Sequence, residues 1–248
     1  MRIDKYLADC GIGTRSEVKK YIKAKQITVN GTVALKPETK IDENADVICF
    51  KGQPITYEKY VYYLFHKPAG CVTAKQDNVH QTVMDYFPED ICAKDIAPVG
   101  RLDLDTEGLL LLTNDGPLTH HLLSPAHHIP KTYYAILDKE VPADAVEKFA
   151  EGVDIGDDKP TLPAELVILP TGTVSNGEIK GTEADKPVYS VELTIHEGRF
   201  HQVKRMFEAV GCTVTYLKRL SMGSLVLGEL SKGDYRKLLP EEVQSLQK

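Results

Sequence analysis

Hydrophobic residues near the start of the chain recur at helical spacing. Ile3, Tyr6 and Leu7 would share one face of a short helix, which the glycine-containing residues 11–13 should end. Thr14 followed by Glu17 three positions later is the pattern of a capping box, so a second helix is expected from residue 14 onward.

Beyond residue 25 the pattern becomes mainly strand-like. Residues 27–33 are typical of a hairpin, because an Asn-Gly pair interrupts two β-branched segments. Residues 46–50 predict a further strand, and residues 52–55 are interpreted as the start of a linker. The elements expected after the linker are strands at 61–65, 109–112 and 188–195, helices at 142–152 (with Pro142 in the first turn) and 201–210, and a hairpin tip at 172–186.

These elements predict an α+β protein with two domains. The first, residues 1–58, is a small domain of helices and a hairpin, and the second, residues 59–248, has a central, mainly antiparallel sheet. A chain of 248 residues is long enough to bury a core in each. We expect a cleft across the sheet of the second domain, with residue 103 on a loop that enters it.

Composition narrows the class of protein. The chain is 42% hydrophobic and 27% charged, and it contains no run of eighteen apolar residues that could span a membrane. Its N-terminus is too polar for a secretory signal. The cysteines are dispersed and odd in number, which favours reduced thiols in a cytoplasmic protein: Cys10, Cys49, Cys71, Cys92 and Cys212.

Charge is distributed unevenly. The net charge of -6 argues weakly against nucleic-acid binding, but phosphate binding depends on local patches. Residues 2–25 hold seven basic side chains against three acidic ones, and residues 199–219 hold five against one. Either patch suits contact with a phosphate backbone, although on charge alone a solvated helix face is the better explanation of the first one.

The densest candidate chemistry lies in residues 100–108, Gly-Arg-Leu-Asp-Leu-Asp-Thr-Glu-Gly. A calcium loop fails, because Asn114 stands where the bidentate glutamate belongs. A pair of glycosidase carboxylates, a single catalytic Asp103 beside Arg101, and a purely structural turn before a buried strand all remain open. The histidine pairs at 120–121 and 127–128 lack cysteine partners and an HExxH pattern, so we expect no metal site.

Two resemblances to known families favour one of these interpretations over the others. The stretch RIDKYLADCGIGTRSEVKKYIKAKQITVNG, residues 2–31, resembles the S4-type RNA-binding domain. The resemblance implies RNA binding through the basic second helix and its surroundings, with candidate contacts at Arg2, Arg15, Lys19, Lys20 and Lys23.

The second resemblance covers essentially the whole chain. GRLDLDTEGLLLLTNDG, SPAHHIPKTYYA and IHEGRFHQVKRMFEAVG occur in the order found in the RsuA-type branch of the pseudouridine synthases. The resemblance implies that Asp103 is the catalytic carboxylate and that Asp105 and Glu107 are secondary. It further implies substrate-binding roles for Arg101, for Tyr133 as a stacking ring, for Lys204 as the cation beside Asp103, and for Leu217 as an apolar wall.

The expected reaction is the isomerisation of a uridine in ribosomal RNA. Cutting and remaking the bond from uracil to ribose involves no redox step or phosphate transfer, so neither a cofactor nor a metal is required. Within this branch the wording of the motifs favours 16S small-subunit RNA, free or in an assembling subunit, and a monomer is expected. The alternatives are the same reaction on 23S RNA, a non-catalytic RNA-binding assembly factor, and a metal-dependent hydrolase.

Overall fold

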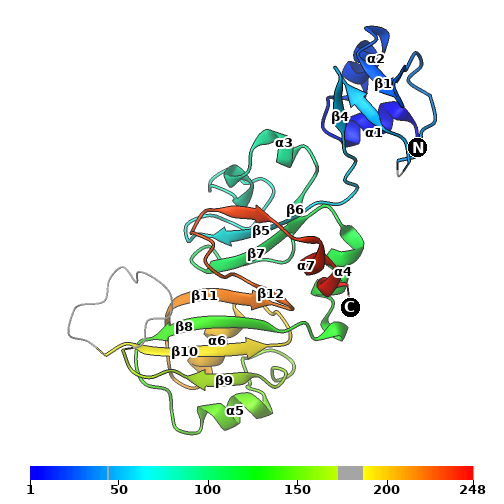
Figure 1. Ribbon diagram of the computed structural model, residues 1–248. Coiled ribbons are helices and arrows are strands. Elements are labelled where there is room, and N and C mark those ends of the chain that lie inside the picture. The colour runs from blue at the N-terminus through cyan, green and yellow to red at the C-terminus, as the bar shows by residue number, and fades with distance from the viewer. Residues whose placement is uncertain (44, 173–186, 248) are drawn as a thin grey trace. The chain divides into compact units, whose positions relative to one another are not determined.

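Two short helices and a four-stranded sheet form the N-terminal part of the chain (Figure 1). The computed structural model describes residues 1–43, 45–172 and 187–247, which divide into two compact units. The first unit comprises residues 1–61 and 87–96. Its elements are α1 (Ile3–Asp9), α2 (Arg15–Lys23), β1 (Ile27–Val29), β2 (Thr32–Val33), β3 (Ile48–Phe50), β4 (Gln53–Ile55) and α3 (Glu89–Cys92).

The local signals of this unit are realised in the structure. The Thr14 hydroxyl accepts a hydrogen bond from the Glu17 amide, and the Glu17 carboxylate accepts one from the Thr14 amide, so the predicted capping box is confirmed. Asn30 and Gly31 have φ values of 49° and 80°, which is the turn expected between β1 and β2. The apolar faces of both helices pack with strand residues in one core that includes Ile3, Ile22 and Ile27.

The interpretation of residues 52–55 as a linker is wrong. These residues form β4, which pairs with β3 at the edge of the sheet in the order β2-β1-β3-β4. An edge position tolerates Pro54, because a proline there does not interrupt the pairing of an inner strand. Lys51 and Gly52, with φ values of 49° and 80°, make the intervening turn.

The second unit comprises residues 62–86 and 97–248, of which 173–186 and 248 lie outside the described residues. Its large sheet has the strand order β13-β5-β7-β11-β8-β10-β9, with β12 beside β11 and β6 beside β7. The strands are β5 (Tyr62–Lys67), β6 (Ala97–Pro98), β7 (Glu107–Thr113), β8 (Lys131–Leu137), β9 (Glu165–Ile168), β10 (Tyr189–Ile195), β11 (Val214–Met222), β12 (Leu225–Val226) and β13 (Tyr235–Lys237). The helical segments are η1 (Val83–Tyr86), α4 (Gly116–Leu123), η2 (Pro125–His127), α5 (Ala145–Glu151), α6 (Gln202–Ala209) and α7 (Pro240–Leu246).

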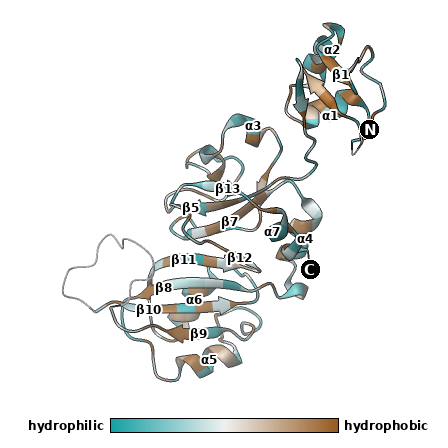
Figure 2. Cartoon of the chain, in the orientation of Figure 1, coloured by the Kyte–Doolittle hydropathy of each residue, from teal (hydrophilic) through white to brown (hydrophobic). Residues whose placement is uncertain are grey.

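The predicted α+β class with a mainly antiparallel sheet is confirmed. Among the described strands, β7 and β11 make the one parallel pairing. All residues of β5 and β7 are buried, including the polar or charged residues at their ends, and the four leucines 109–112 form the apolar centre of β7. Figure 2 shows hydrophobic colour along β7 and on β9 at the edge of this sheet.

Pro142 is not in the first turn of a helix: α5 starts at Ala145, after a turn in which the Ala145 amide donates to the Pro142 carbonyl. The predicted hairpin tip at 172–186 falls almost entirely outside the described residues. In the part of the chain that is described, no helix has the length and apolar character needed to cross a bilayer.

Candidate active site

The second unit contains a cavity of about 720 Å³ beside the middle of the large sheet. Its wall is built from the loop that precedes β7, from β8 and β11, and from the segment that leads into α6. All five residues proposed for chemistry and substrate binding from the sequence line this one cavity: Arg101, Asp103, Tyr133, Lys204 and Leu217. Their individual roles stay predictions.

A buried lysine holds the loop that carries Asp103. Lys67, at the end of β5, has no exposed surface, and burial lowers the pKa of its ammonium group. The ammonium donates to the backbone carbonyls of Pro68, Asp103 and Thr106 at 3.0, 3.0 and 2.9 Å. Three carbonyl partners satisfy all three protons of the charge, so the loop is fixed through its backbone and the Asp103 carboxylate remains free to face the cavity.

Further contacts fix the same loop from both sides. The Thr73 hydroxyl donates to the Leu102 carbonyl at 2.8 Å and accepts from the Leu102 amide at 3.2 Å. After the loop, Gly108 has a φ of +107°, and a Cβ atom there would lie 2.2 Å from the Arg219 carbonyl oxygen. Only glycine permits the close parallel approach of β7 and β11 that places this loop next to the cavity.

Two basic side chains approach the Asp103 carboxylate, which is 29% exposed. His201 Nε2 lies 3.5 Å from Oδ1, and Lys204 Nζ lies 3.5 Å from Oδ2. Lys204 is nevertheless closer to Asp105, to which it donates hydrogen bonds of 2.6 and 2.8 Å. Burial acts to raise the pKa of Asp105, but the Lys204 ammonium outweighs it and the pKa lies below its ordinary value. Lys204 is therefore shared between two carboxylates.

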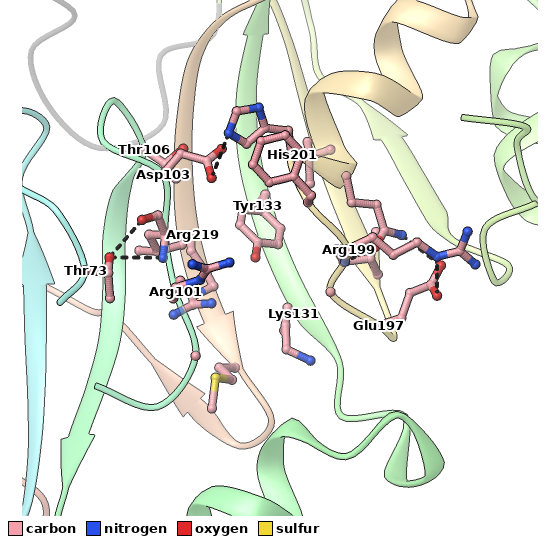
Figure 3. Close-up of a pocket in the computed structure, with 18 of the residues that line it drawn as sticks. Thr73, Arg101, Asp103, Thr106, Lys131, Tyr133, Glu197, Arg199, His201 and Arg219 are labelled. Carbon is pink, nitrogen blue, oxygen red and sulfur yellow. Dashed lines mark hydrogen bonds and ion pairs between the residues drawn. The ribbon is translucent and has the colours of Figure 1, made fainter. Parts of the chain in front are cut away.

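Tyr133 and Leu217 supply apolar surface to the cavity. They lie on β8 and β11 and are 8% and 5% exposed. The adjacent Tyr134 is on the opposite face of the sheet and packs edge-on against Tyr216, with ring centroids 6.2 Å apart. Arg101 is exposed on the loop of Asp103 (Figure 3).

Sequence reasoning missed several residues of this wall. His201 was not singled out, although it approaches Asp103 and stacks on Phe200 with ring centroids 3.8 Å apart. Lys131 was noted only as part of a motif, and Arg219 only as part of a basic patch, yet both line the cavity and are almost completely buried. Their burial depends on how β8 and β11 pair, which charge patterning along the chain does not reveal.

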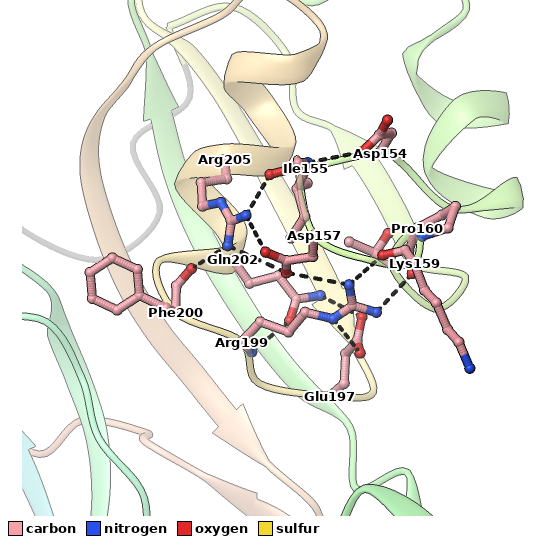
Figure 4. Close-up of polar contacts among 12 residues, drawn as sticks. Asp154, Ile155, Asp157, Lys159, Pro160, Glu197, Arg199, Phe200, Gln202 and Arg205 are labelled. Carbon is pink, nitrogen blue, oxygen red and sulfur yellow. Dashed lines mark hydrogen bonds and ion pairs between the residues drawn. The ribbon is translucent and has the colours of Figure 1, made fainter.

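Two arginines of the second basic patch make local contacts within the unit. Arg199 donates to Glu197 and to the carbonyls of residues 159 and 160, as Figure 4 shows. Arg205 binds Asp157 and donates to the Phe200 carbonyl at 3.1 Å. These two arginines therefore fix the turn before α6, and with it the position of Phe200 and His201 at the cavity.

The basic residues proposed for RNA binding lie in the first unit. Arg15, Lys19, Lys20 and Lys23 are all exposed on α2. Arg2 is also exposed but pairs with the buried carboxylate of Asp4 at 2.9 Å, so part of its role is structural.

The histidine pairs make local contacts. The His121 and His127 rings lie 4.1 Å apart, and His127 Nδ1 is 2.8 Å from the His121 carbonyl oxygen. Within the described ranges no group of three or more candidate ligands gathers as it would around a metal ion.

Comparison with known proteins identifies the family. The family described as RNA pseudouridylate synthase matches residues 61–209, a segment that holds the Asp103 loop, β8 and α6. The chain belongs to this family. The predicted family and reaction class, conversion of uridine to pseudouridine in RNA, are thereby confirmed, and a match of residues 1–47 to the S4 domain confirms the N-terminal RNA-binding resemblance.

Full-length relatives support the same assignment. An uncharacterised RNA pseudouridine synthase, YtzG of Bacillus subtilis, is 40% identical over 99% of this chain and 98% of its own. Ribosomal small subunit pseudouridine synthase A is 38% identical in Haemophilus influenzae, over 100% of both chains, and in Escherichia coli, over 99% and 100%. A crystal structure of a pseudouridylate synthase is 36% identical, with a TM-score of 0.64 and coverage of 99% of both chains.

Proposed function

We propose that this synthase isomerises one uridine of small-subunit (16S) ribosomal RNA, with Asp103 as the catalytic carboxylate. The observation that carries the proposal is the placement of Asp103. Its carboxylate lies on a loop fixed through the backbone, in the wall of a cavity large enough for a nucleoside, with two basic groups at 3.5 Å.

The reaction needs an ionised carboxylate next to the ribose. Whether Asp103 attacks C1′ or removes a proton from C2′, the carboxylate form is the active one. Lys204 favours negative charge at this position, and His201 does so when protonated. Both lie 3.5 Å from the carboxylate, which accepts no direct side-chain hydrogen bond within the described residues.

The other wall residues suit a flipped nucleotide. A uridine in folded RNA must leave its stack, and enzymes hold such a base by stacking and apolar contacts. We assign the stacking role to Tyr133 and the opposing apolar wall to Leu217. Arg101, exposed at the mouth, is suited to a backbone phosphate or to the position that the base has left.

We further propose a division of labour along the chain. Residues 1–58 bind RNA through the exposed cations of α2, and residues 59–248 carry out the reaction. The names of the full-length relatives from Haemophilus influenzae and Escherichia coli favour the small subunit over 23S RNA. We infer that the enzyme acts as a cytoplasmic monomer on free or assembling small subunits.

The test maps pseudouridine in ribosomal RNA from cells that lack this gene. Complementation uses the wild type, Asp103→Asn and, as a matched control, Asp144→Asn, which changes an exposed aspartate paired with Lys148. Loss of one 16S site that the wild type and the control restore, and Asp103→Asn does not, supports the proposal. Loss of a 23S site would contradict the assignment of 16S RNA as the substrate. A pseudouridine map that does not change in the absence of the gene would favour the non-catalytic assembly factor.

A further inference from the structure

Two buried cations share the cavity with Tyr133. Lys131 and Arg219 are 9% and 2% exposed, and both line the cavity (Figure 3). Lys131 precedes Tyr133 by two positions on β8, which places both side chains on the same face of the sheet. Arg219 is the partner of Tyr133 in the register of β11 with β8. The two cations therefore lie on the side of the cavity where Tyr133 would hold a base.

Neither cation has the partners that burial normally demands. The Lys131 ammonium donates to the Ile129 carbonyl at 2.8 Å, and Arg219 Nε donates to the Leu109 carbonyl at 2.7 Å. Arg219 Nη2 is buried and meets no hydrogen-bond acceptor in the described part of the chain. Burial and the nearby Arg219 lower the pKa of Lys131 to about 8, and no carboxylate among the described residues offsets them. A buried, unpaired charge is costly, so an anionic ligand is the physical reason to retain this pair.

We propose that Lys131 and Arg219 bind the uracil base while it is detached from the ribose as an anion. The proposal rests on the function proposed above. When the C1′–N1 bond breaks, its electron pair goes to the base, and the charge spreads over the ring nitrogens and the two carbonyl oxygens. The base then turns, C5 bonds to C1′, and the proton lost from C5 is balanced by a proton gained at N1. No oxidant or further reactant is involved, and either route open to Asp103 gives the same anion.

Position favours the base over a backbone phosphate as the ligand. The phosphates of the target nucleotide are joined to RNA on both sides and must stay at the mouth of the cavity, where Arg101 is exposed. Lys131 and Arg219 lie instead with the ring of Tyr133, and both are shielded from solvent. Charges shielded in this way stabilise a delocalised anion much more strongly than they could in water.

The two cations also suit a base that must turn. A detached base that leaves the cavity cannot be rejoined, so the cavity has to hold it throughout the rotation. The two Lys131 protons that are not bonded to the Ile129 carbonyl can follow an oxygen as it moves, and the Arg219 guanidinium presents several donors in one plane. The same pair can therefore contact O2 before the rotation and O4 after it.

The test compares leaving groups. Steady-state kcat and KM are measured on small-subunit RNA transcripts that carry either uridine or 4-thiouridine, whose base is more acidic than uracil and keeps its C5 hydrogen. The variants are Lys131→Met, Arg219→Met and the charge-preserving Arg219→Lys. Lys148→Met, which changes an exposed lysine of the same unit, is the control. Thermal unfolding of each variant shows whether it is folded.

Lys131→Met is expected to lower kcat on uridine roughly 100-fold, with a clearly smaller loss on 4-thiouridine. Arg219→Lys should retain more activity than Arg219→Met. An equal loss on both substrates, or a raised KM with unchanged kcat, overturns the proposal, the latter in favour of a phosphate site. If 4-thiouridine does not react, the proposal is judged from Lys131→Met on uridine alone: a lower kcat supports it, and a raised KM with unchanged kcat contradicts it. A wild type that forms no pseudouridine in this RNA contradicts the proposed function itself, which separates the two failures.

Discussion

Lys204 lies nearer to Asp105 than to Asp103. Its ammonium is 2.6 Å from Oδ1 of Asp105 and 3.5 Å from Oδ2 of Asp103, and Asp105 is largely exposed while Asp103 faces the cavity. A lysine carries a compact charge without the planar fork of arginine, so it cannot hold both carboxylates in bidentate geometry. Asp105 therefore competes for the cation that should serve Asp103.

This competition predicts unequal effects at the two aspartates. Asp103→Asn keeps the size of the side chain and removes its charge, and it should lower kcat by more than about 100-fold. Asp105→Asn should change kcat by less than about 10-fold, because it only frees Lys204 to approach Asp103. Steady-state assays of pseudouridine formation measure kcat for both variants. Equal losses at the two positions would show that Asp105 takes part in the chemistry.

The buried Lys67 is expected to be essential to the fold of the catalytic loop. Lys67→Met removes the buried ammonium's hydrogen bonds to the carbonyls of Pro68, Asp103 and Thr106, although the Asp103 carbonyl still accepts one from the Thr106 amide at 3.1 Å. We expect a loss of about 2–4 kcal/mol in the free energy of unfolding, together with most of the activity. Urea unfolding measures the first quantity, with Lys148→Met as the exposed control. A variant as stable as the control would mean that the loop does not depend on Lys67.

The elements of the fold that the sequence predicted correctly are those encoded by short-range sequence patterns. The capping box at Thr14 and the Asn30-Gly31 turn are short-range patterns, and both were predicted correctly. β4 was missed because Pro54 in a Gly-containing stretch is typical of a linker, and only its place at the sheet edge makes it a strand residue.

The candidate active site could likewise be predicted only in part from the sequence. The motif resemblance placed Asp103 and Lys204 in one site although they are about a hundred positions apart in the chain, and both line the same cavity. The contacts that hold these residues come from side-chain-to-backbone bonds, such as those of Lys67, which leave no pattern in the sequence. The burial of Arg219 likewise depends on the close approach of Gly108 to β11.

Lys131 makes stability depend on pH in the alkaline range. The pKa of Lys131 is about 8 in the folded protein, below its ordinary value of 10.5, so between these limits the unfolded chain binds more protons than the folded one. The free energy of unfolding should therefore rise with pH across this window, by at most about 3 kcal/mol from this group.

Lys131→Met tests this dependence. At pH 7 the variant should be more stable than the wild type by about 1–2 kcal/mol, since the cost of a buried charge is gone, and its advantage should shrink as the pH rises above 8. Urea unfolding at several pH values measures the difference. A constant difference between pH 7 and pH 10 would assign the stability change to packing instead of ionisation.

The exposed cations of α2 should set the salt dependence of RNA binding. Changing Lys19, Lys20 and Lys23 together to alanine removes three charges from an exposed helix face without touching its buried Val18 and Ile22. Each phosphate contact releases counterions, so losing three contacts should lower the slope of log K against log salt by about 2 to 3 and weaken binding at low salt.

Filter binding of a small-subunit RNA transcript between low and moderate salt measures this slope. The matched control changes Lys139, Lys148 and Lys159 to alanine, because all three are exposed in the second unit and lie outside the cavity wall. The α2 variant should keep its kcat at saturating RNA, since its cavity is unchanged, and lose affinity alone. A salt slope equal to that of the control would show that these lysines are a solvated helix face, and the phosphate contacts would then have to be sought on other surfaces of the chain.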